Sequence, residues 1–341
     1  MNIKEIASKA GVSVATVSRV LNHPENVASE TRAKILSVME ESNYTPNWFA
    51  RGLNFNRTNT IAMIIPNILD QGYMEIAKGI EDVAHQKDCI TLFCNAEDSI
   101  DKERQYIDNL LQRRVDGIVL VSTLLEDSDI KRLKERNIPI VLIGENNKLT
   151  GIPKVHIDCE GAAYIAVTHL INAGYKKITM VYGESPKSEN EKKIAGYKRA
   201  LDECDYPVNI NMIIKTENDI QGGYIAGKKI IEGEDIPDAM FASSDLIAIG
   251  IIEAMKDNGT RVPDDVAVIG FDNNKMTKYI EPKLTTVEKP MHKMGVVGAR
   301  LLFDIVENVE EDFFPEREIV LQSKLKVRKS CGESDRLEEM F

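Results

Sequence analysis

The pattern of apolar residues changes abruptly near residue 60, and this change most constrains what the chain can fold into. Before Thr60 the apolar residues recur at helical spacing, and no strand signal interrupts them. After Thr60, short apolar runs alternate with amphipathic stretches of helix length. We therefore expect an all-α head joined to an α/β core, in a chain of 341 residues that is too long for a single ordinary core.

The head is expected to contain three helices. The first ends at Gly11, the second runs from Val14 to about Leu21, and the third runs from an N-cap at Ser29 through Met39. The residues expected to face the core of the head are Ile6, Ala7, Ala10, Val17, Val20, Leu21, Ile35, Leu36 and Met39. Two helices joined by a glycine turn are typical of a helix-turn-helix, although an ordinary small helical bundle has the same spacing.

The core contains two series of strand-like runs, which predicts two similar lobes. Each lobe is expected to be a doubly wound parallel sheet with helices on both faces, because strands alternate with helices along the chain. The expected strands are Ile61–Ile65, Ile90–Phe93, Ile118–Val121, Ile140–Ile143, Ile178–Val181, Met212–Ile214, Met240–Ala242 and Val266–Gly270. Segments near Asp158, Glu288 and Leu321 are expected to carry the chain between the lobes.

The outer face of the second helix suits a DNA groove. With the apolar residues inward, small side chains and one arginine, Arg19, are left toward solvent. An arginine can reach the O6 and N7 atoms of guanine with two parallel hydrogen bonds. Hydroxyl groups on this helix suit phosphate contacts, which fix register. The candidate DNA-contacting residues of the head are Ser13, Val14, Ala15, Thr16, Ser18, Arg19 and Asn22.

Charge is distributed in a way that fits this prediction weakly. The whole chain has a net charge of −11, but residues 1–59 hold seven Lys or Arg and five Asp or Glu. The head is therefore slightly basic and the remainder acidic, as expected if only the head meets DNA phosphates. Chance variation over a short segment would give the same balance.

Several classes of protein lack their usual signals in this sequence. It has no apolar run long enough for a membrane span and no signal-peptide core at its start. Its five cysteines are scattered, which fits a reducing cytoplasm. Neither a nucleophile motif nor a metal-ligand spacing is present. We therefore expect a cytoplasmic protein that is not an enzyme and that needs no cofactor and no metal.

The stretch IKEIASKAGVSVATVSRVLN, followed by ETRAKILSVMEESNYTPNWFARGL, resembles the head of LacI/GalR-family bacterial transcription regulators. The downstream segments RRVDGIVLV, SSDLIAIGIIEAMKDNGTRVPDDVAVIGFDN and LTTVEKPMHKMG agree with this family in the same order. The resemblance runs from Ile3 to about Arg328. It implies a homodimeric regulator, expected to be a repressor, that binds a palindromic operator and responds to a small molecule.

The resemblance also implies a hinge helix that folds on DNA, matching PNWFARGL. Ala50 and Leu53 are its candidate DNA contacts, with Leu53 wedged between base steps in the minor groove. Such a short helix containing Gly52 is expected to be marginal alone, because nucleation is unfavourable and glycine costs about 1 kcal/mol relative to alanine. Trp48 and Phe49, where smaller aliphatic residues are more usual, are expected to pack between hinge and core, with a role as anchors of the core as the alternative.

The expected domains follow from the pattern and the resemblance together. Residues 1–45 form the helix-turn-helix domain and 46–59 the hinge helix and linker. Residues 60–330 form a core similar to periplasmic binding proteins, which binds the effector and dimerises. Its first lobe covers about 60–158 and 290–320, and its second lobe about 159–289 and 321–330. Residues 331–341 form a tail that we expect to be disordered, too short for a tetramerising coil.

The effector is expected between the lobes, beyond the carboxyl ends of the strands. A sugar or sugar derivative is the expected ligand class. In the family, an aspartate bonds the ligand at the position of Asp272, although a capping role is the alternative. Lys193 stands where many members have arginine, and with Lys187 it would favour an acidic ligand unless both belong to a solvated charge run. The candidate effector-binding residues are Leu69, Asp70, Tyr73, Asn95, Lys187, Lys193 and Asp272.

Three other interpretations stay open from the sequence. A sugar-binding protein of a transport system would account for the core but not for the head. A nucleotide-dependent enzyme would need a complete glycine-rich fingerprint, which is absent. Some members of the family take a phosphorylated carrier protein as corepressor on a basic helix after Met294-Gly295. Here Arg300 is basic but Asp304, one turn later, is acidic, so this is the minority interpretation.

Overall fold

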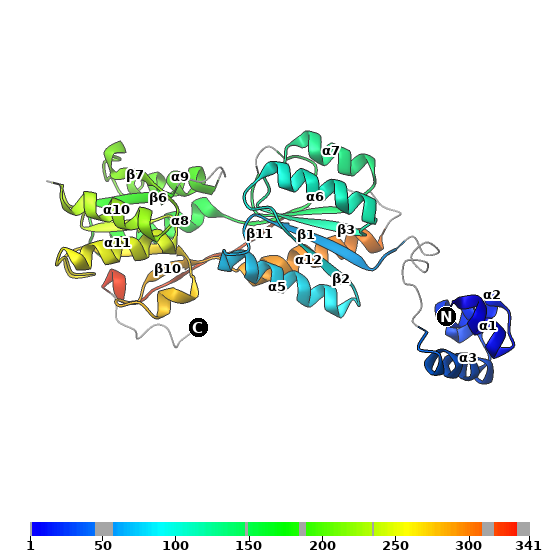
Figure 1. Cartoon of the computed structure of the whole chain (residues 1–341). Helices are drawn as coiled ribbons and strands as arrows, with labels where there is room; N and C mark the ends of the chain where they lie inside the picture. Colours follow the sequence, from blue (N-terminus) through cyan, green and yellow to red (C-terminus); the bar gives the residue numbers. More distant parts are fainter. Residues whose placement is uncertain are drawn as a thin grey trace. The chain divides into compact units, whose positions relative to one another are not determined.

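The computed structural model describes residues 2–44, 57–146, 149–183, 189–233, 235–308 and 317–332. The chain divides into two compact units, Met1–Thr60 with Arg114–Asp116 and Ile61–Arg113 with Gly117–Phe341. The first contains the helical head and the second contains most of the α/β core (Figure 1). Among the described residues, no helix is long and apolar enough to cross a bilayer.

The head consists of α1 (Ile3–Ala10), α2 (Val14–Asn22), the 3-10 turn η1 (Pro24–Asn26) and α3 (Ser29–Glu41). Asn2 begins α1 with a capping box that involves Glu5, and Gly11 ends it with φ of 67°. A positive φ is costly for residues with a Cβ, which explains glycine at this turn. The side chains that form the core of the head are Ile6, Ala7, Ala10, Val17, Val20, Ile35 and Met39.

Two details of the third helix differ from the expectation. Its N-cap is Ala28 and not Ser29, which is the first helical residue. Ala28 has no side-chain oxygen, so the first turn of α3 has no side-chain cap. Leu36, expected to face the core, is 49% exposed, because Ile35 and Met39 already occupy the buried stripe.

The first sheet of the core has the strand order β11-β5-β4-β3-β1-β2. Its strands are β1 (Thr60–Ile65), β2 (Ile90–Asn95), β3 (Gly117–Val121), β4 (Ile140–Ile143), β5 (Lys154–Ile157) and β11 (Glu318–Leu321). On one face lie α5 (Gln71–Gln86) and α12 (Met291–Glu307), and on the other lie α6 (Ile100–Arg113) and α7 (Asp127–Glu135) (Figure 1).

The second sheet has the order β12-β10-β9-β8-β6-β7. Its strands are β6 (Ile178–Gly183), β7 (Ile213–Thr216), β8 (Ala239–Ala242), β9 (Ala267–Asp272), β10 (Thr285–Glu288) and β12 (Lys324–Lys326). The helices around it are α8 (Cys159–Asn172), α9 (Glu189–Asp202), α10 (Ile220–Ile231) and α11 (Asp245–Asp257), with short 3-10 turns η2 (Ile210–Met212), η3 (Lys275–Lys278) and η4 (Lys329–Cys331).

Alternating strand residues show how the helices cover this second sheet. Phe241 packs in the cluster that contains Tyr197 of α9, whereas its neighbour Met240 packs in the cluster that contains Ile251 of α11. Successive side chains of a strand point to opposite faces. The pair α8 and α9 therefore covers one face and the pair α10 and α11 covers the other.

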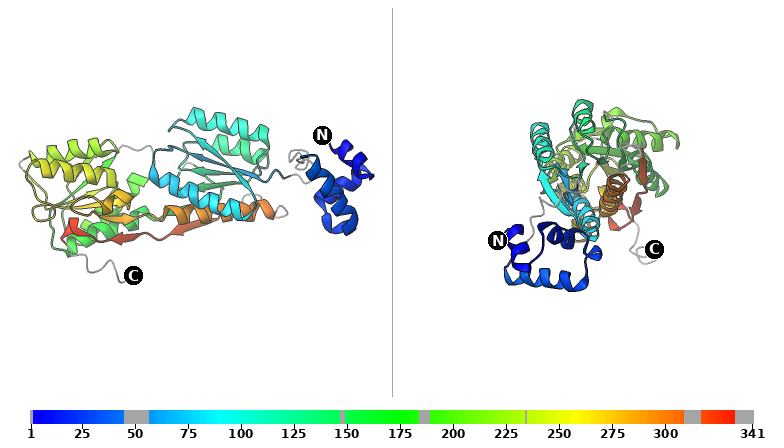
Figure 2. Two further views of the ribbon diagram at one scale, coloured as in Figure 1. Left: turned by 60° about the horizontal axis from the view of Figure 1, so that its bottom comes forward. Right: turned by 90° about the vertical axis from the view of Figure 1, so that its right-hand side faces the viewer.

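The chain passes between the sheets three times. β5 leads into α8, β10 leads into α12, and β11 leads into β12. Figure 2 shows the last passage, in which β11 and β12 follow one another from the first sheet to the second. These crossings lie at the three places named from the sequence, close to Asp158, Glu288 and Leu321.

The two-lobed α/β fold is as predicted, but the sheets are not wholly parallel. β12 pairs antiparallel with β10, because it enters the second sheet straight from β11 without a helical crossover. Four strands that the sequence did not predict, β5, β10, β11 and β12, span only three or four residues each. Cys331, expected to open the disordered tail, is buried in η4, and residues 333–341 lie outside the described part.

The helices α5 and α12 approach so closely that their contact requires glycine. A Cβ at Gly79 would lie 2.2 Å from the backbone oxygen of His292, and one at Gly295 would lie 2.1 Å from that of Ile76. Backbone atoms cannot move aside as a flexible side chain can. The first lobe therefore depends on two helices that pack backbone to backbone.

We predict that Gly79→Ala lowers the free energy of unfolding by roughly 1–3 kcal/mol, because overpacking outweighs the better helix propensity of alanine. Urea titration of the purified protein measures this. Gly72→Ala in the same helix is the matched control, since its nearest neighbour is the movable end of Met291 at 2.8 Å. An equal loss in both variants would contradict the role assigned to the close backbone contact.

Candidate functional site

The exposed face of α2 is formed as the helical spacing predicts. Val17 and Val20 are buried, while Val14 is 40% exposed and Ala15 and Arg19 are also exposed. Thr16 and Ser18 are half-buried, and Asn22 is the last residue of the helix. The structure thus leaves a shallow surface of small side chains from which one long cation, Arg19, extends.

Ser13 has a structural role at the start of this helix. Its hydroxyl accepts a hydrogen bond from the Thr16 backbone N–H at 3.1 Å and lies 2.8 Å from the Thr16 hydroxyl. As the N-cap it satisfies one of the free donors of the first turn. A helix N-terminus with further free N–H groups is a suitable place for a phosphate. Ala50, Leu53 and the whole hinge segment lie outside the described residues.

In the first lobe, three candidate residues follow β1 and the fourth, Asn95, ends β2; together they fix their own loop. The side-chain oxygen of Asn95 accepts a hydrogen bond from the Ile68 backbone N–H at 3.0 Å. Asp70 caps α5 by accepting from the backbone N–H of Gly72 at 2.7 Å. Tyr73 packs partly against the core, and Leu69 is 88% exposed. Asp70 and Asn95 therefore shape the loop whether or not they contact a ligand.

In the second lobe, Asp272 ends β9 in a conformation that non-glycine residues rarely adopt. Its φ is 112°, and that of Asn273 is 59°. Buried polar groups hold this turn. Asp245 accepts from the Asn274 backbone N–H at 2.6 Å, and Arg328 donates to the side-chain oxygen of Asn273 at 2.7 Å. Such strain persists where the surroundings fix it, and it gathers at functional sites.

Two buried lysines lie beside Asp272. Lys193 donates from Nζ to the backbone oxygen of Ser243 at 3.0 Å, and its Nζ lies 4.1 Å from the ring centroid of Phe271. Lys289 forms an ion pair with Glu189 at 3.0 Å and lies 3.9 Å from Asp272. The structure thus gives Lys193 fixed partners instead of a solvated charge run, and Lys187 lies outside the described residues.

The charges of this cluster perturb one another. Burial raises the pKa of Asp272 to about 6, although Lys289 and Lys193 lower it. Asp70 of the first lobe raises this pKa further, so the two lobes bring their candidate carboxylates within electrostatic range. Burial lowers the pKa of Lys289, but Glu189 and Asp272 raise it by more, so that its pKa is raised overall. Burial also raises the pKa of Asp245 well above its usual value.

The sequence interpretation missed Lys289 and Asp245, and it noted Glu189 only as part of the charged loop with Lys187 and Lys193. Lys289 directly follows β10, which pairs with β9 so that Glu288 lies opposite Asp272. Recognising the short run Thr285–Glu288 as a strand would have placed Lys289 at the same sheet edge as Asp272. Asp245 follows the N-cap Ser244, a position that the sequence alone assigns to capping.

Comparison with known proteins gives the decisive observation. Residues 2–47 match the model of the bacterial regulatory proteins of the lacI family, and residues 167–331 match the periplasmic binding protein-like domain. Catabolite control protein A of Priestia megaterium is 39% identical over 303 residues, which cover 89% of this chain and 91% of that protein.

The chain belongs to the LacI family of bacterial transcription regulators.

Solved structures agree with the fold of this LacI-family regulator. The complex of the transcriptional regulator CelR with cellobiose has a TM-score of 0.73 at 26% identity, covering 97% of this chain and 99% of that chain. A lac repressor dimer bound to operator and the anti-inducer ONPF has a TM-score of 0.86 at 23% identity, with the same coverage. The regulator is thus a DNA-binding protein, and the transport-protein and enzyme alternatives are wrong.

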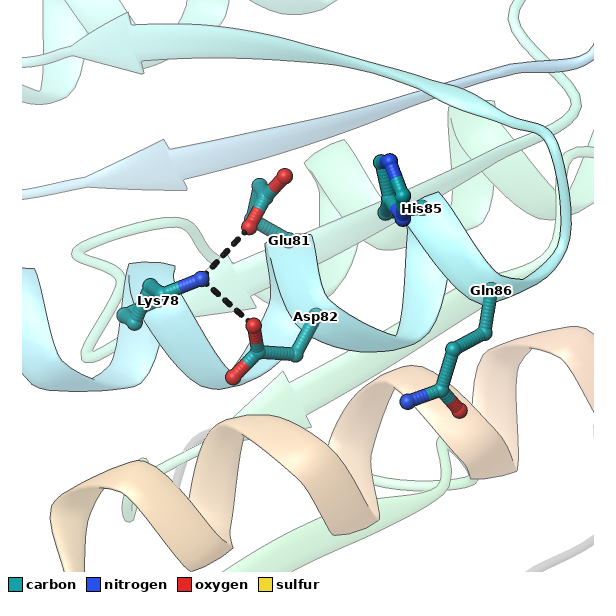
Figure 3. A pocket seen from close by; sticks show the side chains of 5 residues that line it. All are labelled: Lys78, Glu81, Asp82, His85 and Gln86. Carbon is teal, nitrogen blue, oxygen red and sulfur yellow. Dashed lines mark hydrogen bonds and ion pairs between the residues drawn. The ribbon is translucent and has the colours of Figure 1, made fainter.

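A second group of charged residues on this LacI-family regulator lies away from the cluster around Asp272. A shallow pocket on α5 is lined by Lys78, Glu81, Asp82, His85 and Gln86, and Lys78 points toward the two carboxylates (Figure 3). Lys78 pairs with Glu81 at 2.9 Å and with Asp82 at 2.5 Å. Among the described residues, no group of three or more His, Cys, Asp or Glu could hold a metal ion.

The raised pKa of Asp272 predicts a pH effect on stability. A carboxyl whose pKa rises from 3.8 to about 6 on folding contributes stability below pH 4 that is lost as the pH rises through 6. Because the Asp272 side chain is 34% exposed, solvent screening reduces the effect. We predict that Asp272→Asn raises the free energy of unfolding at pH 7 by about 1 kcal/mol relative to the unsubstituted chain.

Urea titrations at pH 4.5 and pH 7 measure this effect. The gain from Asp272→Asn should be larger at pH 7 than at pH 4.5. The matched control is Asp101→Asn, which replaces an exposed carboxyl on α6 and should not reproduce the larger gain at pH 7. A gain that is independent of pH would show that the ionised Asp272 carboxylate carries no penalty in the folded state.

Proposed function

We propose that this regulator binds a palindromic DNA operator as a homodimer, expected to act as a repressor, and that a small polar molecule between the lobes of its core changes its affinity for that DNA. The exposed face of α2, with its small side chains around Arg19, is the observation that carries this proposal. Small side chains let a helix lie deep in the major groove, where an arginine fork reaches guanine.

The proposed DNA contacts divide by role. Arg19 reads a base, with Val14, Ala15 and Asn22 beside it. Ser13, Thr16 and Ser18 lie where the helix start meets the phosphates, so they fix register and not sequence. In the hinge, Ala50 and Leu53 enter the minor groove, and Leu53 separates a base step.

Exposed apolar side chains support the homodimer. In the second lobe they lie on α10 and around η3, where Ile225 is 58% exposed, Met276 is 45% exposed and Tyr279 is 86% exposed. In the first lobe they lie on β2, at the edge of its sheet, where Ile90 is 68% exposed. Large apolar groups of this kind mark association surfaces on a soluble protein. The lac repressor, which has this fold, is a dimer on its operator.

The charge balance of the candidate effector site favours a neutral polar ligand. Lys289 is already paired with Glu189 and lies beside Asp272, and Lys193 lies over Phe271 and donates to a backbone oxygen. An anionic ligand would have to displace these partners. A sugar or sugar derivative can instead bond to Asp272 and Asn95 through its hydroxyl groups and contact Tyr73 with its ring. CelR, whose complex contains cellobiose, has a similar fold.

A phosphorylated carrier protein fits the exposed surface of α12 less well. Arg300 is exposed there, but so are Asp304 and Glu307. His292 on the same helix lies 2.8 Å from Asp82 of α5. This surface has mixed charge, whereas a phosphorylated partner requires a cluster of unpaired cations.

Footprinting across the promoter of the chain's own gene tests the proposal directly. Protection of a palindromic site, weakened as salt is raised, is the expected outcome. We predict that Arg19→Ala then lowers affinity for that site by about 1–3 kcal/mol and relaxes discrimination at a single base pair in each half-site. Binding to a panel of duplexes with single base-pair changes measures this.

Two control variants refine the Arg19 prediction. Arg19→Lys should recover little, because an ammonium group lacks the planar fork. Lys34→Ala, at an exposed position of α3, should not alter base preference. Uniform weakening over all duplexes by Arg19→Ala, together with a shallower salt dependence, would show that Arg19 contacts only phosphate.

The dimer surface has its own test. Ile225→Asp should convert the dimer to monomer, because an apolar interface does not tolerate an unpaired charge at its centre. Ile165→Asp is the matched control, since Ile165 is 48% exposed on α8, which covers the opposite face of the same sheet. Sedimentation equilibrium compares the two variants. If both remain dimeric, α10 does not belong to the interface.

A further inference from the structure

A buried carboxylate, Glu145, joins the two lobes of the core. Glu145 follows β4 in the first lobe, and only 5% of its side chain is exposed. Its Oε1 lies 2.6 Å from Nζ of Lys192, which belongs to α9 of the second lobe. The same oxygen lies 2.9 Å from Nδ1 of His156 on β5, within the first lobe. One oxygen atom therefore receives a cation from each lobe.

The surroundings of His156 require both of its ring nitrogens to carry protons. Nε2 lies 2.6 Å from Glu318 on β11, and Nδ1 faces Glu145 and the backbone oxygen of Ile157 at 3.0 Å. All of these partners are acceptors, so only the imidazolium form satisfies every contact. The hydrogen bond to Glu145 raises the pKa of His156, and although burial lowers it, the net shift is upward.

The second oxygen of Glu145 shows that this arrangement is not fully satisfied. Oε2 is buried, and within the described part of the chain no group donates a hydrogen bond to it. An unpaired buried acceptor is costly. The contacts of Oε1 with Lys192 and His156 therefore have to offset this cost. An ion pair of this kind suits a reversible movement of the lobes better than a permanent contact between them.

Another ion pair between the lobes provides a comparison. Lys275 on η3 lies 3.7 Å from Glu75 on α5, with side chains 72% and 41% exposed. Exposed pairs of this length contribute little, because solvent screens them. Glu145 is 5% exposed and Lys192 is 37% exposed, so their ion pair is screened less than that of Lys275 with Glu75.

We propose that Glu145 and Lys192 form a latch between the lobes, and that the charge on His156 sets its strength. The latch holds the conformation seen here, called closed, against an open one in which Lys192 has left Glu145. It depends neither on the identity of an effector nor on DNA binding, so it stands apart from the function proposed above.

The direction of the pH effect follows from the charges around His156. Glu145 and Glu318 face the ring, Lys154 pairs with the far side of Glu318, and Lys192 approaches only in the closed form. The helix α12 also packs against β5, but none of its described charged side chains pairs with His156. Closure brings a second cation toward the imidazolium, which lowers the pKa of His156 relative to the open form. The open form therefore binds more protons, and falling pH favours opening.

Double electron–electron resonance, which measures the distance between two spin labels on the full chain, tests the latch. Cys89→Ser and Cys204→Ser first remove the less buried native thiols. Spin labels are then attached at one exposed position in each lobe, through Ser128→Cys on α7 and Lys256→Cys on α11. Labelled chain is diluted into an excess of unlabelled chain, so that distances within one chain are observed. Lys192→Gln should raise the open-to-closed ratio on the order of 5- to 10-fold, the effect of a partly buried ion pair.

The matched control is Lys275→Gln, which removes the exposed pair between the lobes and should change the ratio less than about 2-fold. Lys192→Arg should restore the closed population. Lowering the pH should open the unsubstituted chain and should not further open Lys192→Gln.

Nuclear magnetic resonance of the His156 ring adds a measurement that needs no spin labels. Lys192→Gln should raise the pKa of the His156 ring.

Two results would overturn the proposal. One is an unchanged distance distribution in a folded Lys192→Gln protein, and the other is an equal response of Lys192→Gln and Lys275→Gln. An unchanged His156 pKa in Lys192→Gln would remove the role given to the histidine. Circular dichroism of each variant establishes that it is folded before these comparisons are made.

Discussion

The edge of the second lobe that holds Asp272 is governed by the need to pair charges that little solvent reaches. Lys289 and Lys193 would each be costly to bury alone, so Glu189, Asp272 and the face of Phe271 surround them. The strained turn at Asp272 places a carboxylate there, and Arg328 and Asp245 hold that turn from behind. The face that the second lobe offers to a ligand is therefore a set of charges that already have partners, and a ligand must exchange with those partners to bind.

The parts of the fold that repeat a pattern could be predicted from the sequence. The stripe containing Ile6, Val17 and Val20 predicts the core of the head, because a helix buries every third or fourth residue. Short strands carry no such repeat. Thr285–Glu288 and Lys324–Lys326 are strands because neighbouring strands supply their hydrogen bonds, and that information is not local.

The same reason explains what could be predicted of the candidate site. Asp272 and Lys193 were found through motifs, whereas Lys289 and Asp245 gain their significance from strand pairing and burial. The alternative role given to Asp272, a cap of the following turn, belongs instead to its neighbours, since Asn274 begins η3 and caps it. Asp70 shows the reverse, because a residue chosen as a ligand contact proves to be the cap of α5.

The paired charges of this site also limit how an effector could act. A ligand that only adds contacts to both conformations shifts no equilibrium, however tightly it binds. It must change the relative free energy of the open and closed forms, and that difference has to be small for a metabolite to overcome it. A site whose cations are paired within one lobe meets this condition, because Lys289 and Lys193 keep their partners when the lobes separate and no unpaired charge is exposed.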